Sequence, residues 1–263
     1  MGVAPVAGEL RAFYETGYSV AGPAEGEQLG RWRALGGRSK AAHVAALCDR
    51  TELSPRTVVE IGCGDGALLA ALSARGVGEV LDGFELSETA AALARQKDLE
   101  RVGRVESYDG EHVPATDGAY DLAVLSHVAE HVRDPASLLR EARRVARHVV
   151  VEVPLEANRS AARPTKRAEA VRIGHVQAFD RATVRELCVS AGLEVLAELT
   201  DPLPFAHHAF FAGTPARRAR AGFKTAVRRA AFRVAPLGSE RLFTVHYACL
   251  AESAPPAGDV ARD

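Results

Sequence analysis

From Thr57 onward, short apolar runs alternate with longer segments whose apolar positions recur at helical spacing. Short β-branched runs indicate strands, and apolar positions three and four apart indicate helices. The predicted strands are "TVVEI" (57–61), "EVLDGFEL" (79–86), "GRVESY" (103–108), "YDLAVLS" (120–126), "HVVVEVP" (148–154), "LEVLAEL" (193–199) and "RLFTVHYACLAE" (241–252). This alternation predicts an α/β fold, in which a largely parallel sheet of seven strands carries helices on both faces.

Residues with capping chemistry stand at the ends of the helical segments between these strands. Ser87, Asp134 and Asp180 each precede a segment of helical periodicity, where a side-chain oxygen can accept a bond from the first turn. Gly76 and Gly192 follow two of the segments, in the place where glycine commonly ends a helix. The pattern therefore predicts where four of the core helices begin or end.

The pattern divides the chain into a core with additions. Residues 1–56 are predicted to form an N-terminal helical cap, and 57–201 to form the ligand-binding core. Residues 202–239 are predicted to be a basic helical insertion before the last strand, 240–252. The small, polar end 253–263 is predicted to be disordered.

Composition narrows the class of protein. The chain has 263 residues, a formal net charge of −1 and 25% charged residues, so no overall field favours nucleic acid or membranes. Its four cysteines lie far apart without a C-x-x-C pair, as in a reduced intracellular protein. We find no signal peptide and no apolar stretch long enough to span a bilayer, so we expect a cytoplasmic protein.

A glycine loop follows the first predicted strand, in "VVEIGCGDG" (58–66). A strand, a glycine loop and a helix N-terminus form a nucleotide-type site at the carboxyl edge of a parallel sheet. The loop carries Glu60 and Asp65 and no basic residue before Arg75. Carboxylates repel a pyrophosphate but favour the cationic sulfonium of S-adenosylmethionine, so the charge favours that cofactor over NAD(P). Asp65 could also simply cap the following helix.

Three motifs, taken in order, carry a family resemblance. "VVEIGCGDG", "YDLAVLSHVAEHVRDP" and "GHVQAFDRATVRELCVSAGLEV" resemble the conserved segments of class I S-adenosylmethionine-dependent methyltransferases. They are most similar to the branch that includes ubiquinone and menaquinone biosynthesis methyltransferases, over residues 54–199. The resemblance implies a Rossmann-like sheet whose last strand runs antiparallel to the others.

The resemblance also implies a cofactor site. It assigns Glu60 to the cofactor's amino group, Glu85 to the ribose hydroxyls and Asp109 to the adenine amine, while the glycines let the backbone close over the ligand. The complete set comprises Glu60, Gly62, Cys63, Gly64, Gly66, Glu85, Leu86, Asp109, Gly110 and Ser126. Simpler readings remain open for some members: Asp109-Gly110 is also an ordinary turn pair, and Cys63 also suits core packing.

Histidines near the expected methyl position are candidates for catalysis. His127 directly follows the fourth predicted strand, His131 lies four residues on, and His175 precedes a segment that returns to the same edge. A base is needed only if the acceptor must lose a proton, as a hydroxyl does. We favour His127 as the catalytic or acceptor-orienting residue, ahead of His131 and His175. The structural alternative for a histidine at a strand end stays open.

A metal site formed by these histidines and Glu130 is the alternative. His127, Glu130, His131 and His175 resemble the E-x-x-E-H plus histidine set of small-RNA terminal methyltransferases. His127 stands where that pattern has its first glutamate, so we expect no metal.

The acceptor would be selected by the added segments. Aromatic residues in 1–40, among them Tyr14, Tyr18 and Trp32, suggest a lid, or else plain helix packing. The insertion has no acid from Pro202 to Ser239 but carries Arg217, Arg218, Arg220, Lys224, Arg228, Arg229 and Arg233. On a helical wheel an apolar stripe runs beside these bases, consisting of Phe223, Val227, Ala230 and Val234.

Two interpretations of the insertion follow. One is a surface helix on the fold with a solvated basic face; the other is contact between 214–234 and an anionic substrate or membrane surface. No base-stacking aromatic set accompanies the arginines, so nucleic acid is not expected.

We therefore expect an S-adenosylmethionine-dependent methyltransferase that methylates a hydroxyl oxygen of a small molecule. The alternatives are N- or C-methylation of a lipid-linked or phosphorylated acceptor, an NAD(P)-dependent oxidoreductase, and a non-catalytic scaffold.

Overall fold

A computed structural model of the chain describes residues 11–12, 15–18 and 23–254. Its strands are β1 (Thr57–Ile61), β2 (Val80–Glu85), β3 (Val102–Ser107), β4 (Tyr120–Ser126), β5 (Ala146–Leu155), β6 (Leu193–Asp201) and β7 (Val245–Ser253). Its helices include α2 (Pro23–Arg50), α3 (Ala67–Arg75), α4 (Glu88–Arg95), the 3-10 turn η1 (Ala129–His131), α5 (Pro135–Val145), α6 (Pro164–Arg172), α7 (Arg181–Ser190), α8 (Phe205–Ala209), α9 (Pro215–Val234) and α10 (Pro236–Glu240). All seven predicted strands are present.

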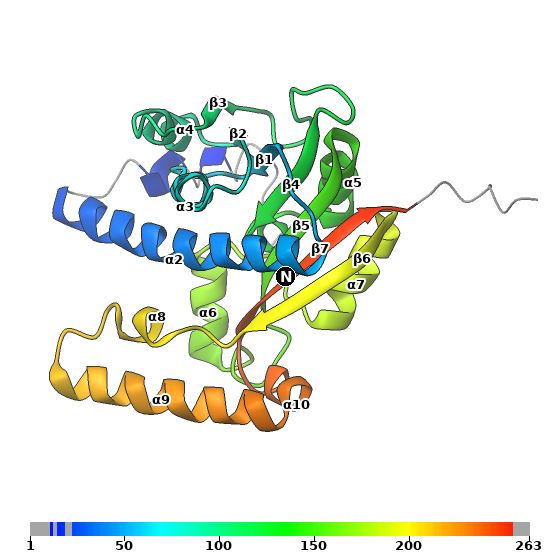
Figure 1. Cartoon of the computed structure of the whole chain (residues 1–263). Coiled ribbons are helices and arrows are strands. Elements are labelled where there is room, and N and C mark those ends of the chain that lie inside the picture. The colour runs from blue at the N-terminus through cyan, green and yellow to red at the C-terminus, as the bar shows by residue number, and fades with distance from the viewer. Residues whose placement is uncertain (1–10, 13–14, 19–22, 255–263) are drawn as a thin grey trace, which may run out of the picture.

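The strands form one sheet in the order β3-β2-β1-β4-β5-β7-β6 (Figure 1). β7 runs antiparallel to both of its neighbours, while the pairs β1–β2, β2–β3, β1–β4 and β4–β5 are parallel. The predicted Rossmann-like methyltransferase sheet with an antiparallel last strand is confirmed. The chain reverses its direction of winding between β1 and β4, and in open sheets ligands bind at such a switch point.

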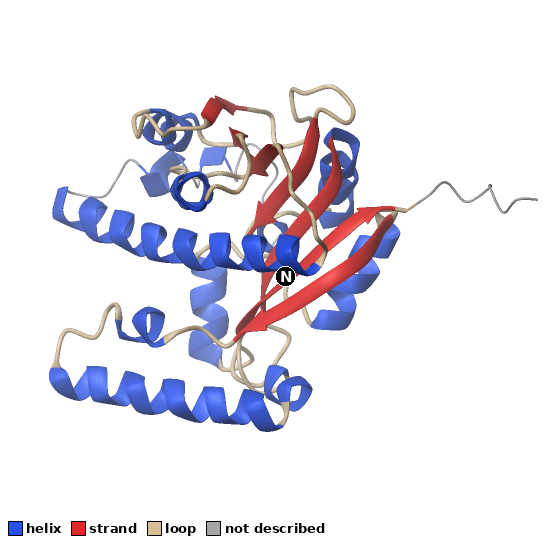
Figure 2. Cartoon of the chain, in the orientation of Figure 1, coloured by secondary structure: helices blue, strands red, loops and turns tan. Residues whose placement is uncertain are grey.

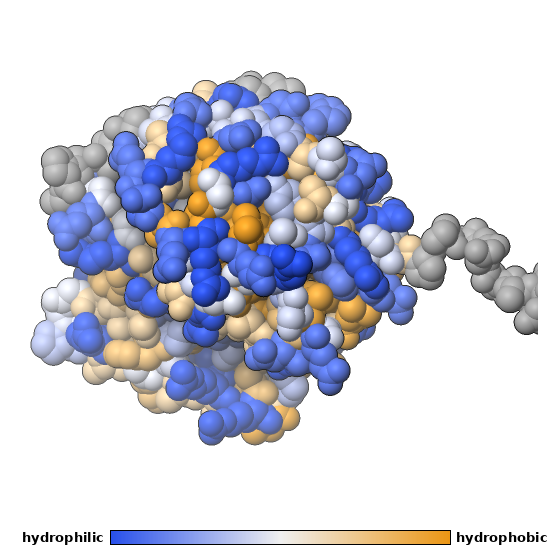
Figure 3. All heavy atoms as spheres, turned by 45° about the horizontal axis from the view of Figure 1, so that its top comes forward, coloured by the Kyte–Doolittle hydropathy of each residue, from blue (hydrophilic) through white to orange (hydrophobic). Residues whose placement is uncertain are grey.

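Helices cover the sheet on both faces (Figure 2). On one face α2, α3 and α4 pack residues such as Leu47 and Leu69 against Val58 and Leu122. On the other face α5 and α7 pack residues such as Leu139 and Val184 against the alternate positions of the same strands. Hydrophilic side chains cover most of the face seen in Figure 3, with hydrophobic residues emerging in patches between them.

The predicted helix ends are confirmed where the sequence offered a cap. The side chains of Ser87, Asp134 and Asp180 accept hydrogen bonds from Ala90 N, Ser137 N and Thr183 N. Gly76 and Gly192 have φ values of 71° and 75°, in the left-handed region that glycine adopts without strain.

Some element boundaries differ from the prediction. Within the predicted helical cap, α2 is continuous from Pro23 to Arg50, because no proline interrupts it after its first residue. The last strand begins at Val245, after α10, and includes Ser253, which pairs with Leu193 and was wrongly placed in the disordered tail. Residues 255–263 and Tyr14 lie outside the described part of the chain.

The orientation of α9 corrects the predicted stripe. Phe223 and Val234 are 73% and 87% exposed, whereas Arg228 is buried. Arg228 donates hydrogen bonds to the carbonyl oxygens of Pro202 and Thr244, and its guanidinium lies over the ring of Phe243. α9 therefore docks through an arginine that satisfies backbone carbonyls, and its apolar stripe faces outward.

No helix among residues 11–12, 15–18 and 23–254 has the length and hydropathy needed to cross a membrane.

Gly37 is predicted to be required at the crossing of α2 and α3. A Cβ at this position would lie 2.4 Å from the carbonyl oxygen of Ala67, which is backbone at the start of α3. We expect Gly37→Ala to destabilise the fold by about 1–3 kcal/mol, as overpacking does. Gly30→Ala on the same helix, with no atom within 4 Å, should be neutral or stabilising by up to ~1 kcal/mol. Chemical denaturation compares the two; equal midpoints would contradict the close-approach argument.

Candidate functional site

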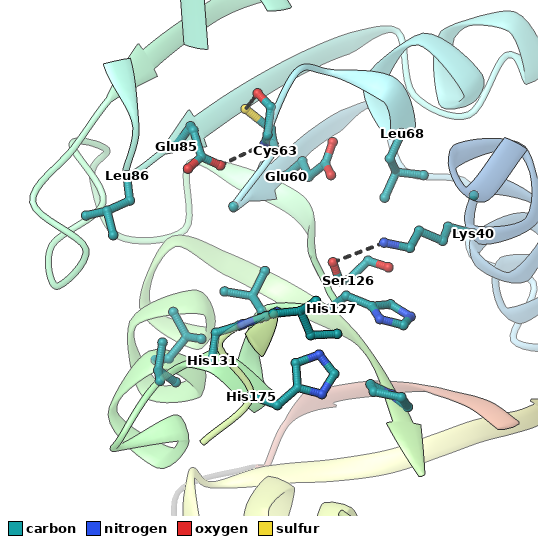
Figure 4. Close-up of a pocket in the computed structure, with 18 of the residues that line it drawn as sticks. Lys40, Glu60, Cys63, Leu68, Glu85, Leu86, Ser126, His127, His131 and His175 are labelled. Atoms are coloured by element: carbon teal, nitrogen blue, oxygen red, sulfur yellow. Dashed lines mark hydrogen bonds between the residues drawn. The ribbon is translucent and has the colours of Figure 1, made fainter. Parts of the chain in front are cut away.

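A cavity of about 1330 Å³ lies at the carboxyl edge of the sheet, beside the β1/β4 switch point. Residues from strand ends far apart in sequence line it, including Gly62 after β1. Glu85 at the end of β2 and Ser126 at the end of β4 also line it (Figure 4). Its volume exceeds that of most sites for one small ligand, so the cavity has room for two.

Backbone conformation explains the first two glycines of the loop. Gly62 has a φ of 82°, and a Cβ there would lie 2.5 Å from Cγ2 of Val128. A Cβ at Gly64, whose φ is 54°, would lie 2.7 Å from the hydroxyl oxygen of Tyr18. Tyr18 and Val128 therefore lie directly against the loop, and a side chain at Gly62 or Gly64 would push them away.

Glu85 is held in a fixed position at the end of β2. Its carboxylate oxygens accept hydrogen bonds from Gly64 N at 2.7 Å and Ser87 N at 3.0 Å. Burial raises the pKa of Glu85, and these backbone donors act in the opposite direction. Glu85 is buried at the strand end and not solvated there.

Glu60 is buried at the cavity wall. Within the described residues its Oε2 has no hydrogen-bond partner. Burial raises the pKa of Glu60, opposed by the positive charge of Lys40. A buried carboxylate oxygen at a cavity wall is an acceptor for a donor group of a ligand.

Asp65 is paired with basic residues, although none lies near it in the sequence. Arg33 Nε donates to its carboxylate at 2.9 Å, and Lys97 Nζ lies 3.3 Å away. Gly66, without a side chain, occupies the N-cap of α3, so the capping alternative for Asp65 is wrong. The bases that neutralise the loop come from α2 and from beyond α4, which is why the local charge pattern missed them.

The remaining predicted cofactor residues fall into two groups. Cys63, Leu86, Gly110 and Ser126 line the cavity, and the Ser126 carbonyl accepts from Lys40 Nζ at 3.5 Å. Gly66 and Asp109 are not among its lining residues.

Local contacts account for both exceptions. A Cβ at Gly66 would meet Ala94 of α4 at 2.9 Å, so this glycine serves packing. The Asp109 carboxylate accepts from the backbone N–H groups of Glu111 and His112 at 2.7 Å, which is the turn geometry of the simpler reading.

His127 lies in the cavity wall directly after β4, with a strained φ of 60°. Its Nδ1 is 3.2 Å from Glu130 Oε1, and its Nε2 is 3.7 Å from Glu152 Oε1. Burial and Lys40 lower the pKa of His127, but the two carboxylates outweigh them, so the pKa is raised.

His131 and His175 both line the cavity, and their ring centroids are 4.8 Å apart (Figure 4). His131 Nδ1 donates to the Gly174 carbonyl at 3.1 Å, which leaves the lone pair on Nε2, and burial lowers its pKa to about 4. His175 Nδ1 is 2.7 Å from a carboxylate oxygen of Glu156. Both imidazoles are therefore oriented by a partner on one nitrogen.

A second group of ionisable residues, not predicted from the sequence, lies behind His127. Glu152 of β5, fully buried, is surrounded by His43 of α2, His246 of β7 and His127. His43 also lies 3.2 Å from Asp201 Oδ2; burial would lower its pKa, but the two carboxylates raise it to about 9. One signal was available: Glu152 interrupts the apolar run "HVVVEVP", and a buried charge requires partners.

The four residues considered as metal ligands from the sequence fall into two separate groups in the structure. Glu130, His131 and His175 offer ligand atoms within 4.8 Å of one another. His127 groups with Glu152 and His246 at the same limit. Both donor sets combine imidazole and carboxylate, which suit divalent transition metals.

Known proteins share parts of this sequence and this fold. A family model described as "Methyltransferase domain" matches residues 33–198, well over half of the chain. The "Ubiquinone biosynthesis O-methyltransferase" of Thiobacillus denitrificans is 35% identical over 104 residues, which cover 37% of this chain and 43% of the relative. The match thus spans less than half of that curated relative.

Two solved structures are similar in fold. The [4+2]-cyclase SpnF matches with a TM-score of 0.59 and 18% identity, covering 97% of this chain and 99% of that one. Geranyl diphosphate C-methyltransferase from Streptomyces coelicolor, solved with Mg²⁺ and S-adenosylhomocysteine, matches with a TM-score of 0.58 and 15% identity over 81% of this chain and 76% of that one.

The fold and the glycine-loop cavity define the class I S-adenosylmethionine-dependent methyltransferases. The family match shows that this chain belongs to them, with S-adenosylmethionine as the cofactor of the class.

Proposed function

We propose that this protein transfers the methyl group of S-adenosylmethionine to a hydroxyl oxygen of a small-molecule acceptor. The observation that supports oxygen as the target is the pair of oriented imidazoles, His131 and His175, at the cavity beside the end of β4. The name of the Thiobacillus relative points the same way.

The donor is proposed to lie across the glycine loop. Glu85 would accept from both ribose hydroxyls, because its carboxylate is already held by Gly64 and Ser87. The unpartnered Oε2 of Glu60 would accept from the donor's ammonium group or from a bridging water. Gly62 and Gly64 would let the backbone approach the methionine part.

At the acceptor, the hydroxyl oxygen would attack the methyl carbon in line with the breaking carbon–sulfur bond. S-adenosylhomocysteine leaves with the electron pair, and the hydroxyl proton passes to a base. His131 is proposed as that base because Gly174 fixes its Nδ1 proton and Nε2 carries the lone pair. His127, between two carboxylates, is proposed to orient the acceptor. In-line positioning supplies much of the acceleration in such displacements.

The other candidates predict different products. N- or C-methylation would place the label on nitrogen or carbon, and a scaffold would bind the donor without transfer. SpnF shares the fold under the name of a cyclase, so the fold alone does not decide among reactions.

A second proposal concerns the partner of α9, the element that carries the exposed stripe. We propose that α9 contacts an anionic membrane surface, which would present a lipid-linked acceptor to the cavity. Phe223, Val227 and Val234 are exposed beside arginines, and no acid lies between Pro202 and Ser239. An apolar face flanked by bases is typical of helices that lie on anionic lipid.

Glu85 is predicted to dominate donor affinity. Glu85→Ala should weaken S-adenosylhomocysteine binding by at least about 10- to 100-fold, because even one hydrogen bond to a charged group contributes about 1.5–3 kcal/mol. Glu79→Ala, a surface residue paired with Arg56 just before β2, should leave the affinity unchanged. Calorimetric titration measures both. Equal affinities would contradict the assignment, and tight NAD(P)H binding would favour an oxidoreductase.

His131 is predicted to act after the donor has bound. His131→Ala should lower the transfer rate about 10²- to 10⁴-fold, the usual contribution of a general base, without changing donor affinity. His148→Ala, which contacts Asp121 O near the opposite edge of the sheet, is the control. Labelled donor incubated with phenols, catechols and amines reports rate and product. A label on nitrogen or carbon would refute O-methylation.

The exposed stripe is predicted to determine membrane contact. The wild type should float with vesicles that contain phosphatidylglycerol but not with neutral phosphatidylcholine vesicles. Phe223→Ser combined with Val234→Ser should abolish flotation. Val189→Ser, which removes a residue 71% exposed on α7, should not. Absence of wild-type flotation on anionic vesicles would eliminate the membrane proposal while leaving the methyl-transfer proposal intact.

A further inference from the structure

The carboxylate of Glu152 collects three imidazoles at a place where the sheet is otherwise apolar. Glu152 lies in the middle of β5, paired with Ser126 of β4 and Ala248 of β7. Its Oε1 is 3.2 Å from His43 Nδ1, 3.2 Å from His246 Nδ1 and 3.7 Å from His127 Nε2. The elements that contribute these residues are far apart in sequence.

Several polar atoms of this group have no hydrogen-bond partner within the described residues. Of the three described imidazoles, His43 alone makes a hydrogen bond of acceptable geometry to the Glu152 carboxylate. Within the part of the chain that the structure describes, Glu152 Oε2, His127 Nε2 and His246 Nδ1 are buried without a hydrogen-bond partner. A native core leaves few such atoms, and several in one place call for an ion or water that satisfies them together.

We propose that His127, Glu152 and His246 form a binding site for one divalent transition-metal ion. Two imidazole nitrogens and one carboxylate are a donor set that binds Zn²⁺, Mn²⁺ or Fe²⁺ and leaves coordination positions open. Atoms that share a metal at about 2.1 Å lie roughly 3.0–3.4 Å from one another. The 3.2 Å from Glu152 Oε1 to His246 Nδ1 already lies in this range, and the 3.7 Å to His127 Nε2 requires a small contraction. All three ligand atoms lie within 4.8 Å of one another.

Outer contacts orient these ligands. His127 Nδ1 lies 3.2 Å from Glu130 Oε1, which directs Nε2 toward Glu152. His43 bridges Glu152 and Asp201, with 3.2 Å to each, and so fixes the carboxylate. Metal-binding histidines almost always have such a partner on the second nitrogen.

An ion can reach the site and would face the acceptor. His127 and His246 both line the main cavity, and their ring centroids are 4.3 Å apart. The open coordination positions would therefore point into the space beside the end of β4. A bound cation there would take hydroxyl or other oxygen ligands of an acceptor molecule.

The alternative is a closed ion-pair network in which an imidazolium of His127 lies between Glu130 and Glu152. Such a network balances charge but leaves His246 Nδ1 and Glu152 Oε2 unpartnered. A metal would engage all three ligand side chains at once.

The test must separate this site from Glu130, His131 and His175 in the same cavity. His175→Ala removes that second group and becomes the parent protein. After treatment with chelator and dialysis, the full-length parent is titrated with Co²⁺, followed by the visible absorption of bound Co²⁺ and by equilibrium dialysis. We expect one Co²⁺ per chain.

Three variants of the parent locate the ion. Adding His246→Ala or His127→Gln should weaken Co²⁺ binding at least ~100-fold and abolish the visible bands. Adding His148→Ala, the control outside the cavity, should change nothing. S-adenosylhomocysteine binding and circular dichroism report whether each variant is folded. If His246→Ala does not fold, His246→Asn replaces it in the experiment.

Two results would overturn the proposal. One is a folded parent that binds no Co²⁺; the other is unchanged binding in the folded His246 or His127 variants. Because donor affinity is measured separately, neither result bears on the proposed methyl transfer.

Discussion

The site depends on one geometric constraint. The strands β1, β2, β4, β5 and β7 must bring their functional residues to a single edge of the sheet. β1, β2 and β4 end there, which places Gly62, Glu85 and Ser126 around one cavity. β7 runs the other way, so its first residues arrive at the same edge and His246 joins residues of β4 and β5. Reversal of that one strand adds a histidine that a wholly parallel sheet would carry at the opposite end.

A second consequence is the concentration of buried charge next to the cavity. Glu60, Glu130 and Glu152 are buried, and they are offset by Lys40 and by imidazoles from α2, β4 and β7. Burying charge costs free energy unless partners compensate it, so a fold retains such groups chiefly where they bind or react. Glu60 lies near the glycine loop, whereas Glu130 and Glu152 lie among the histidines.

The added segments adapt this core. α2 supplies Arg33, Lys40 and His43 to three different parts of the site. Trp32 of the same helix contacts His207 of α8 and Phe210 beyond it, which ties the N-terminal helix to the insertion. The proposed lid role of the N-terminal segment stays a prediction, although Tyr18 already lies against Gly64.

The family resemblance indicated that Glu60 and Glu85 lie at the cavity, as they do. Local sequence was sufficient for the strands and for the caps at Ser87, Asp134 and Asp180. These features depend on residue periodicity and on contacts within a few positions, which the order of residues encodes directly. Only the tertiary structure decided the rest: that Arg33 and Lys97 neutralise Asp65, that Asp109 turns onto its own loop, and that α9 presents its apolar stripe outward. It also joined His43, Glu152 and His246, which lie up to 203 residues apart in sequence. Long-range pairing and helix orientation depend on how whole elements pack, and no local pattern of residues records that packing.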